Sequence, residues 1–99
     1  MTPAATPAVV VLTDRKASTA AGRPLAATVA GALAAGATAV LLREKDLPPQ
    51  DRRRLAESLR TLTADTGAAL LIASDATLAR TVGADGVHLA AADPWPDPP

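Results

Sequence analysis

The sequence has no cysteine, phenylalanine or tyrosine, and one tryptophan and one histidine among its 99 residues. Without cysteine the chain forms no disulfides or thiolate metal sites, which is typical of a reducing compartment. Scarce aromatics leave the core to Ala, Val, Leu and Ile, which remove less area from water per residue. An excess of either charge is lacking as well, because ten basic and ten acidic residues give a net charge of +0. We therefore expect neither nucleic acid nor a membrane surface as a partner.

Long apolar runs are also missing. No run approaches the ~20 residues needed to cross a bilayer, and the first residues lack the basic region of a signal peptide. We therefore expect a cytoplasmic protein. Hydrophobic residues make up 48% of the chain and charged residues 20%, which indicates one small globular domain.

Apolar runs alternate with helical patterns along the chain. Strands are predicted at residues 8–12, 38–43, 68–72 and 86–89, and helices at 24–36, 48–67 and 75–83. Residues 16–23 have a loop-like composition, and the β-branched run at 8–12 is typical of a strand buried on both faces. Each predicted helix ends at a Gly-Ala pair, which indicates a repeated turn from helix to strand. Repeated βα units predict a parallel sheet with right-handed crossovers.

The second predicted strand ends in alternating charges. Because side chains alternate between the faces of a strand, one face carries Leu41, Arg43 and Lys45. The other face carries Val40, Leu42 and Glu44. Two cations thus lie at the carboxyl end of a strand, where α/β proteins bind ligands, and they suit a phosphate or pyrophosphate. Alternatively, the strand simply leaves the core for solvent at this point.

Three motifs in the same order resemble the thiamine phosphate synthase family, which includes the related thiazole tautomerases. They are Leu-Arg-Glu-Lys-Asp-Leu at 42–47, Gly-Ala-Asp-Gly-Val-His-Leu at 83–89 and Val-Leu-Thr-Asp-Arg at 11–15. The resemblance covers nearly all of this chain but only the amino-terminal half of the family. It implies an α/β fold of parallel βα repeats that form the amino-terminal half of a TIM-type (β/α)₈ barrel. The partial barrel domain would occupy residues 1–93, followed by a proline-rich tail at 94–99.

The resemblance also implies a reaction of thiamine biosynthesis. Family members join hydroxymethylpyrimidine pyrophosphate to thiazole phosphate and release pyrophosphate, assisted by Mg²⁺. On this basis Arg43 and Lys45 would bind the pyrophosphate, and Asp93 would be a Mg²⁺ ligand with the hard oxygen chemistry that this ion prefers. Alternatively, Asp93 merely begins the proline-rich tail.

The chain departs from the family pattern at several site positions. Leu41 and Ala91 stand where the family usually has glutamines, and Ala73-Ser74 stands where it has Asn-Asp in contact with pyrophosphate and Mg²⁺. Ser74 is therefore a degenerate metal-ligand position, because a hydroxyl does not replace the charge of a carboxylate. We expect weak activity at best.

Three polar residues near these motifs also have purely structural interpretations. Ser74 is a candidate helix N-cap, and Asp75 is either a displaced metal ligand or, in the interpretation that we prefer, a helix cap. His88 lies within an apolar run, so we expect it to pack in its strand rather than to act as a catalyst.

Two alternatives to an impaired synthase remain open. The chain could be an inactive remnant or half-barrel that acts through association, either as a homo-oligomer or with a complementing chain, because open strand edges and apolar faces favour pairing. It could also belong to the tautomerase branch, which does not need the pyrophosphate-binding residues. The presence of Arg43 and Lys45 disfavours that branch.

Overall fold

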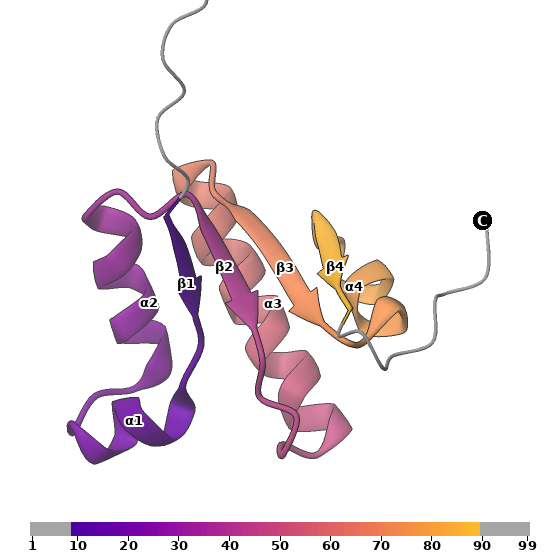
Figure 1. Cartoon of the computed structure of the whole chain (residues 1–99), viewed down its shortest axis with the longest axis horizontal. Helices are drawn as coiled ribbons and strands as arrows, with labels where there is room; N and C mark the ends of the chain where they lie inside the picture. The colour runs from indigo at the N-terminus through magenta and orange to yellow at the C-terminus, as the bar shows by residue number, and fades with distance from the viewer. Residues whose placement is uncertain (1–8, 90–99) are drawn as a thin grey trace, which may run out of the picture.

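A four-stranded parallel sheet organises the chain (Figure 1). The computed structural model describes residues 9–89. Within them the strand order is β1-β2-β3-β4, so strands that follow one another in sequence are neighbours. This confirms the predicted parallel βα arrangement. In chain order the elements are β1 (Val10–Leu12), α1 (Arg15–Ala20), α2 (Leu25–Ala34), β2 (Ala39–Leu42), α3 (Pro49–Thr66), β3 (Ala69–Ala73), α4 (Ala76–Val82) and β4 (Gly86–His88).

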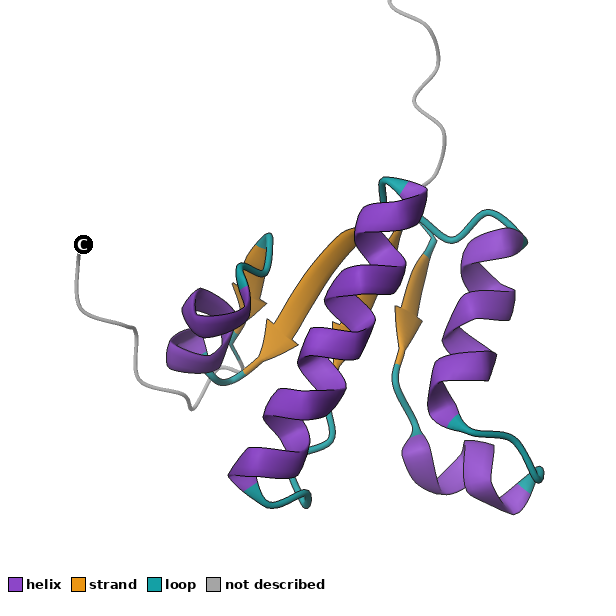
Figure 2. Ribbon diagram, turned by 180° about the vertical axis from the view of Figure 1, so that it is seen from behind, coloured by secondary structure: helices purple, strands orange, loops and turns teal. Residues whose placement is uncertain are grey.

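The two faces of the sheet have different surroundings. The strand register places Leu12, Leu41 and Leu71 side by side on one face. The helices α2, α3 and α4 lie on the opposite face, with α3 crossing the middle of the sheet (Figure 2). The core lies between these helices and the sheet, and its fully buried large side chains are Leu42, Leu59, Leu70, Ile72, Val29, Val40 and Thr63. The hydrophobic effect therefore stabilises one side of the sheet.

Helix boundaries follow local backbone chemistry. Pro49 begins α3, where a missing N–H costs nothing because that donor is unpaired in any helix. Gly67 and Gly83 end α3 and α4 with φ values of 74° and 68°, a left-handed conformation that glycine adopts without a Cβ penalty. The Asp75 carboxylate accepts a hydrogen bond of 2.9 Å from the Leu78 N–H and caps α4. Of the two candidate caps, Asp75 is therefore the one that the structure uses.

Two predictions about the first 25 residues were wrong. Residues 16–23 begin within a helix, α1, rather than a loop, because the Asp14 carboxylate caps it by accepting from the Ala17 N–H at 2.9 Å. Strand β1 is not buried on both faces. Val10 is 46% exposed and Leu12 is 50% exposed, because within the described residues no helix covers the face on which they lie.

Several predictions concern residues 1–8 and 90–99, which lie outside the described residues. They are the start of the partial barrel domain at 1–93, the proline-rich tail at 94–99, and the roles of Ala91 and Asp93. Among the described helices, none has the length and apolar character needed to span a bilayer.

A carboxylate on the loop before β4 connects this strand to its neighbours. Asp85 Oδ2 accepts hydrogen bonds from the Leu70 N–H and from Arg60 Nη1, both at 2.7 Å. The backbone hydrogen bond from Leu70, and then the bond from Arg60, lower the pKa of Asp85 below its ordinary value of 3.8. The ionised form thus stabilises the fold above the ordinary pKa, and this contribution is lost as pH falls through the lowered pKa.

We therefore predict that Asp85→Asn weakens the acid dependence of folding. The asparagine Oδ1 can still accept from the Leu70 N–H, but the side chain no longer titrates. Thermal melts followed by circular dichroism from about pH 7 to about pH 3 should show a lower midpoint for the variant at neutral pH and a shallower fall below about pH 4. An equally steep fall of the melting midpoint below about pH 4 in both proteins would contradict this role of Asp85. Asp46, whose pKa is also lowered, is present in both proteins, so its titration does not distinguish them.

Candidate functional site

A cavity of about 400 Å³ lies at the carboxyl ends of the strands, on the face that the described helices leave uncovered. All four strands or the residues that directly follow them contribute to it. Its lining residues are Leu12, Leu41, Arg43, Lys45, Ala73, Ser74 and His88. The floor is apolar and the polar groups come from the strand ends, which is the usual construction of a ligand site in α/β proteins.

Arg43 and Lys45 lie where the alternation of the second strand predicts. Both line the cavity, whereas Glu44 between them is buried on the other side. Among residues 9–89 neither cation has an ion-pair partner, and both are exposed. Unneutralised cations beside a cavity attract an anion, and the guanidinium fork of arginine matches two phosphoryl oxygens at once.

Ser74 is the first residue after β3 and has a φ of 58°. Its N–H donates a 2.7 Å hydrogen bond to the His88 carbonyl oxygen, which continues the pairing of β3 with β4. A left-handed conformation is uncommon for a residue with a Cβ and costs free energy that the surroundings must supply. The predicted N-cap role of Ser74 is wrong, because Asp75 performs it, and Ser74 lines the cavity instead.

His88 was not expected to contribute to the site. The prediction that it packs within its strand is wrong, since its side chain is exposed and lines the cavity. The register pairs His88 with Ala73, whereas Val87 points toward the core. The sequence could have indicated that His88 faces the cavity side. In a strand, the residue that follows a core residue such as Val87 faces the other side of the sheet.

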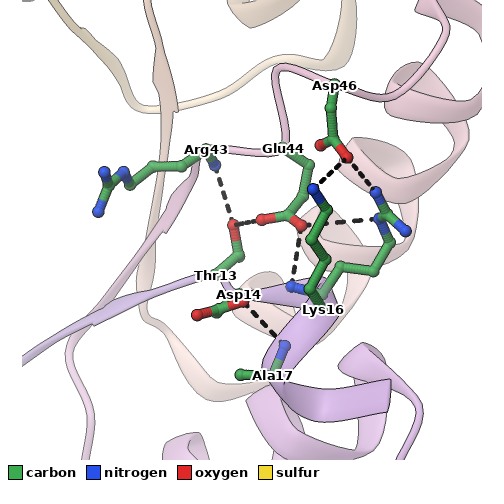
Figure 3. Close-up of polar contacts among 8 residues, drawn as sticks. Thr13, Asp14, Lys16, Ala17, Arg43, Glu44 and Asp46 are labelled. Atoms are coloured by element: carbon green, nitrogen blue, oxygen red, sulfur yellow. Dashed lines mark hydrogen bonds and ion pairs between the residues drawn. The ribbon is translucent and has the colours of Figure 1, made fainter. Parts of the chain in front are cut away.

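A hydrogen-bonded group lies beside the cavity and joins β1 to the loop after β2 (Figure 3). We name it the Thr13–Glu44 network, and its members are Thr13, Arg15, Arg43 and Glu44. Thr13 is 5% exposed and Glu44 is 7% exposed. Asp46 on the same loop forms ion pairs with Arg15 and Lys16. Desolvation raises the pKa of Asp46, but the hydrogen bond and the charge of Arg15 act in the opposite direction, and the pKa lies below its ordinary value.

The described residues do not fit a Mg²⁺ site held by protein side chains. Residues 9–89 contain no cluster of three or more His, Asp or Glu side chains that could hold a metal ion. Ser74 offers a neutral oxygen, and the Asp75 carboxylate is already bonded to the Leu78 N–H and to Arg52 Nη2 at 2.6 Å. The interpretation of Asp75 as a helix cap rather than a displaced metal ligand therefore agrees with its contacts. Asp93 lies outside the described residues.

Parallel βα units, helices on one face of the sheet and a cavity at the strand ends are the features of TIM-type barrel proteins. A solved structure, thiamine phosphate pyrophosphorylase from Pyrococcus furiosus, superimposes with a TM-score of 0.80 and 32% identity over 89% of this chain and 41% of that chain. The family model of thiamine monophosphate synthase matches residues 9–97. The chain belongs to the thiamine monophosphate synthase family.

Curated relatives agree with this assignment. The thiamine-phosphate synthase of Moorella thermoacetica is 44% identical over 72 residues, which are 73% of this chain and 34% of that protein. The thiamine-phosphate synthase of Roseiflexus sp. strain RS-1 is 41% identical over 81 residues, which are 82% of this chain and 34% of that protein. The chain thus spans about a third of the length of these relatives. The resemblance read from the three motifs is confirmed, as is the partial TIM-type fold.

Proposed function

We propose that this chain carries the pyrophosphate-binding part of a thiamine-phosphate synthase. One observation carries the proposal: Arg43 and Lys45 line a single cavity at the strand ends, and among residues 9–89 no carboxylate forms an ion pair with them. Membership of the thiamine monophosphate synthase family supports the same assignment. The proposed ligand is hydroxymethylpyrimidine pyrophosphate, bound through its pyrophosphate group.

The proposed reaction is a substitution at the methylene carbon of the pyrimidine. The bond from this carbon to the pyrophosphate oxygen breaks, and the electron pair leaves with pyrophosphate. The resulting carbocation is captured by the ring nitrogen of thiazole phosphate, whose lone pair forms the new C–N bond. Negative charge accumulates on the departing group, so Arg43 and Lys45 would act by stabilising it. No proton transfer from the protein is needed for this step.

The expected rate is low, because several contacts of the family site are missing. Loss of one electrostatic contact of this kind costs on the order of 3 kcal/mol, or about a hundredfold in rate. Leu41 and Ala73 line the cavity without offering hydrogen-bond donors from their side chains. Mg²⁺ binding stays a prediction that depends on Asp93, and the proposed step assigns no role to the metal. A place in the cytoplasm likewise stays a prediction.

Titration calorimetry of the 99-residue chain with inorganic pyrophosphate tests this proposal. We expect saturable one-to-one binding that is weaker for orthophosphate, because the two cations can contact both phosphoryl groups of pyrophosphate. Samples that bind should then be incubated with hydroxymethylpyrimidine pyrophosphate and thiazole phosphate and assayed for thiamine phosphate by mass spectrometry. Absence of saturable pyrophosphate binding by the folded chain would rule the proposal out.

A second candidate function is association through the uncovered face of the sheet, with a second copy of the chain as the partner. Val9, Val10 and Leu12 are 52%, 46% and 50% exposed, so the β1 edge presents an apolar surface to solvent. Light scattering coupled to size-exclusion chromatography should then find a dimer that Leu12→Ser dissociates. A monomer over the whole accessible concentration range would exclude this candidate.

A further inference from the structure

Glu44 is a buried carboxylate between two exposed cations. Its side chain is 7% exposed, whereas Arg43 and Lys45 on either side face the cavity. Figure 3 shows the Arg43 side chain extending away from the Glu44 carboxylate. Glu44 therefore does not neutralise its neighbour, and it does not line the cavity. Its place in the structure calls for another explanation, because burying a carboxylate costs free energy unless hydrogen bonds compensate for the lost water.

The contacts of Glu44 connect three segments of the chain. Its Oε2 accepts a 2.8 Å hydrogen bond from Thr13 Oγ1, and its Oε1 accepts a 2.8 Å bond from the Arg15 N–H. The Arg15 N–H belongs to the first turn of α1, where it has no partner within the helix. Thr13 Oγ1 in turn accepts a 2.9 Å bond from the Arg43 N–H. A continuous path thus runs from the Glu44 carboxylate through a hydroxyl to the backbone of Arg43.

These hydrogen bonds lie beyond the last backbone pairing of β1 with β2. Strand β2 ends at Leu42, and its ladder with β1 ends at the pair of Leu12 with Leu41. The last backbone bond between the two segments runs from the Thr13 N–H to the Leu41 carbonyl oxygen at 3.0 Å. Beyond it, side-chain hydrogen bonds of the Thr13–Glu44 network replace the ladder. Because Thr13 and Glu44 are buried, the hydrogen bond between them is stronger than it would be in water.

We infer that Glu44 is a positioning residue that fixes the backbone of Arg43 to the end of β1 through Thr13, so that both cations face the cavity. This inference rests on the proposed function of Arg43 and Lys45. It predicts that removal of Glu44 changes the affinity for pyrophosphate in the direction opposite to that expected from charge alone. Removing a negative charge near an anion site should tighten anion binding by Coulomb's law alone. Removing a positioning residue should weaken it, because misplaced cations no longer match the oxygens of pyrophosphate.

Two variants of Glu44 separate these effects. Glu44→Ala removes the charge and both hydrogen bonds, and we expect the Kd for inorganic pyrophosphate to rise by about tenfold or more. Glu44→Gln removes the charge but keeps an oxygen for the Arg15 N–H and an amide group that can donate to Thr13 Oγ1. We expect its Kd to stay within about threefold of the unmodified chain. A Kd that falls or stays unchanged in Glu44→Ala would overturn the inference.

A matched control distinguishes positioning from general stability. Like Glu44, Asp85 accepts one hydrogen bond from a backbone N–H and one from a side chain, but it precedes β4, at the end of the sheet remote from the cavity. Asp85→Ala should lower the melting temperature and leave the Kd for pyrophosphate within about twofold when both proteins are folded. Equal weakening by Asp85→Ala and Glu44→Ala would reduce Glu44 to a stability role and overturn the inference.

Amide hydrogen exchange, measured by NMR, tests the inference without any ligand. In Glu44→Ala the protection of the Arg43 N–H and the Arg15 N–H should fall by about tenfold or more, while core amides of β3 change only with global stability. Unchanged protection at Arg43 would overturn the inference, whatever the chain binds. If protection falls but the unmodified chain binds no pyrophosphate, the proposed function is wrong and Glu44 still fixes this loop.

Discussion

The Arg43→Ala variant is expected to lose pyrophosphate binding, with a rise in Kd of about a hundredfold. Arg43 lines the cavity and has no ion-pair partner among the described residues, so its charge is available to a ligand. Arg43→Lys keeps the charge but loses the planar fork, and it should lie between Arg43→Ala and the unmodified chain, about tenfold weaker than the latter. Titration calorimetry with inorganic pyrophosphate measures both.

Arg80→Ala is the matched control for this prediction. Arg80 is an exposed arginine in the last turn of α4, away from the cavity, so its removal changes the net charge by the same amount. It should change the Kd by less than about twofold at an ionic strength near 0.15 M, where charges more than about 8 Å from the ligand are screened. Similar losses in Arg80→Ala and Arg43→Ala would mean that pyrophosphate responds only to net charge and has no defined site at Arg43.

The second large effect concerns the core. Leu70 in β3 is 0% exposed, and we expect Leu70→Ala to lower the free energy of unfolding by about 2–5 kcal/mol. A domain of this size has few kilocalories to lose, so the melting temperature should fall by more than about 10 °C. Thermal melts followed by circular dichroism give this shift directly.

Leu12→Ala is the informative comparison for Leu70→Ala. Both residues are strand leucines, but Leu12 is 50% exposed on the face that no described helix covers. The same truncation there should cost less than about 1 kcal/mol in the monomer. A loss as large as that of Leu70→Ala would mean that the uncovered face is buried in solution, and it would favour association through that face.

The alternation of side chains in β2 allowed the central part of the site to be predicted from sequence. Leu41, Arg43 and Lys45 all line the cavity, so the period of two residues that begins in β2 continues past the end of the strand at Leu42. The glycine stops Gly67 and Gly83 were predictable for a similar reason, since a left-handed residue after a helix is a local requirement. Local backbone geometry therefore carried these predictions.

What the sequence did not reveal depends on contacts between distant segments. Thr13 and Glu44 are 31 residues apart, and only the pairing of β1 with β2 brings their side chains together. Helix α1 lacks an apolar stripe, so the sequence shows no helical periodicity at this point, although Asp14 caps the helix. The exposure of Leu12 depends on which face the helices cover, which a single strand cannot specify. The role of Asp93 stays a prediction from the resemblance.

The parallel direction of all four strands also has a consequence for how copies of this chain could assemble. The β1 edge and the β4 edge are different surfaces, so an edge contact that continues the parallel order of the strands joins β4 of one copy to β1 of the next. Two copies joined in this way at both edges would complete a ring of eight strands with twofold symmetry. If the rotation between copies departs from half a turn, the same contact repeats without closing and produces a fibre. The twist between strands, rather than the strength of the contact, therefore decides between a barrel and a filament.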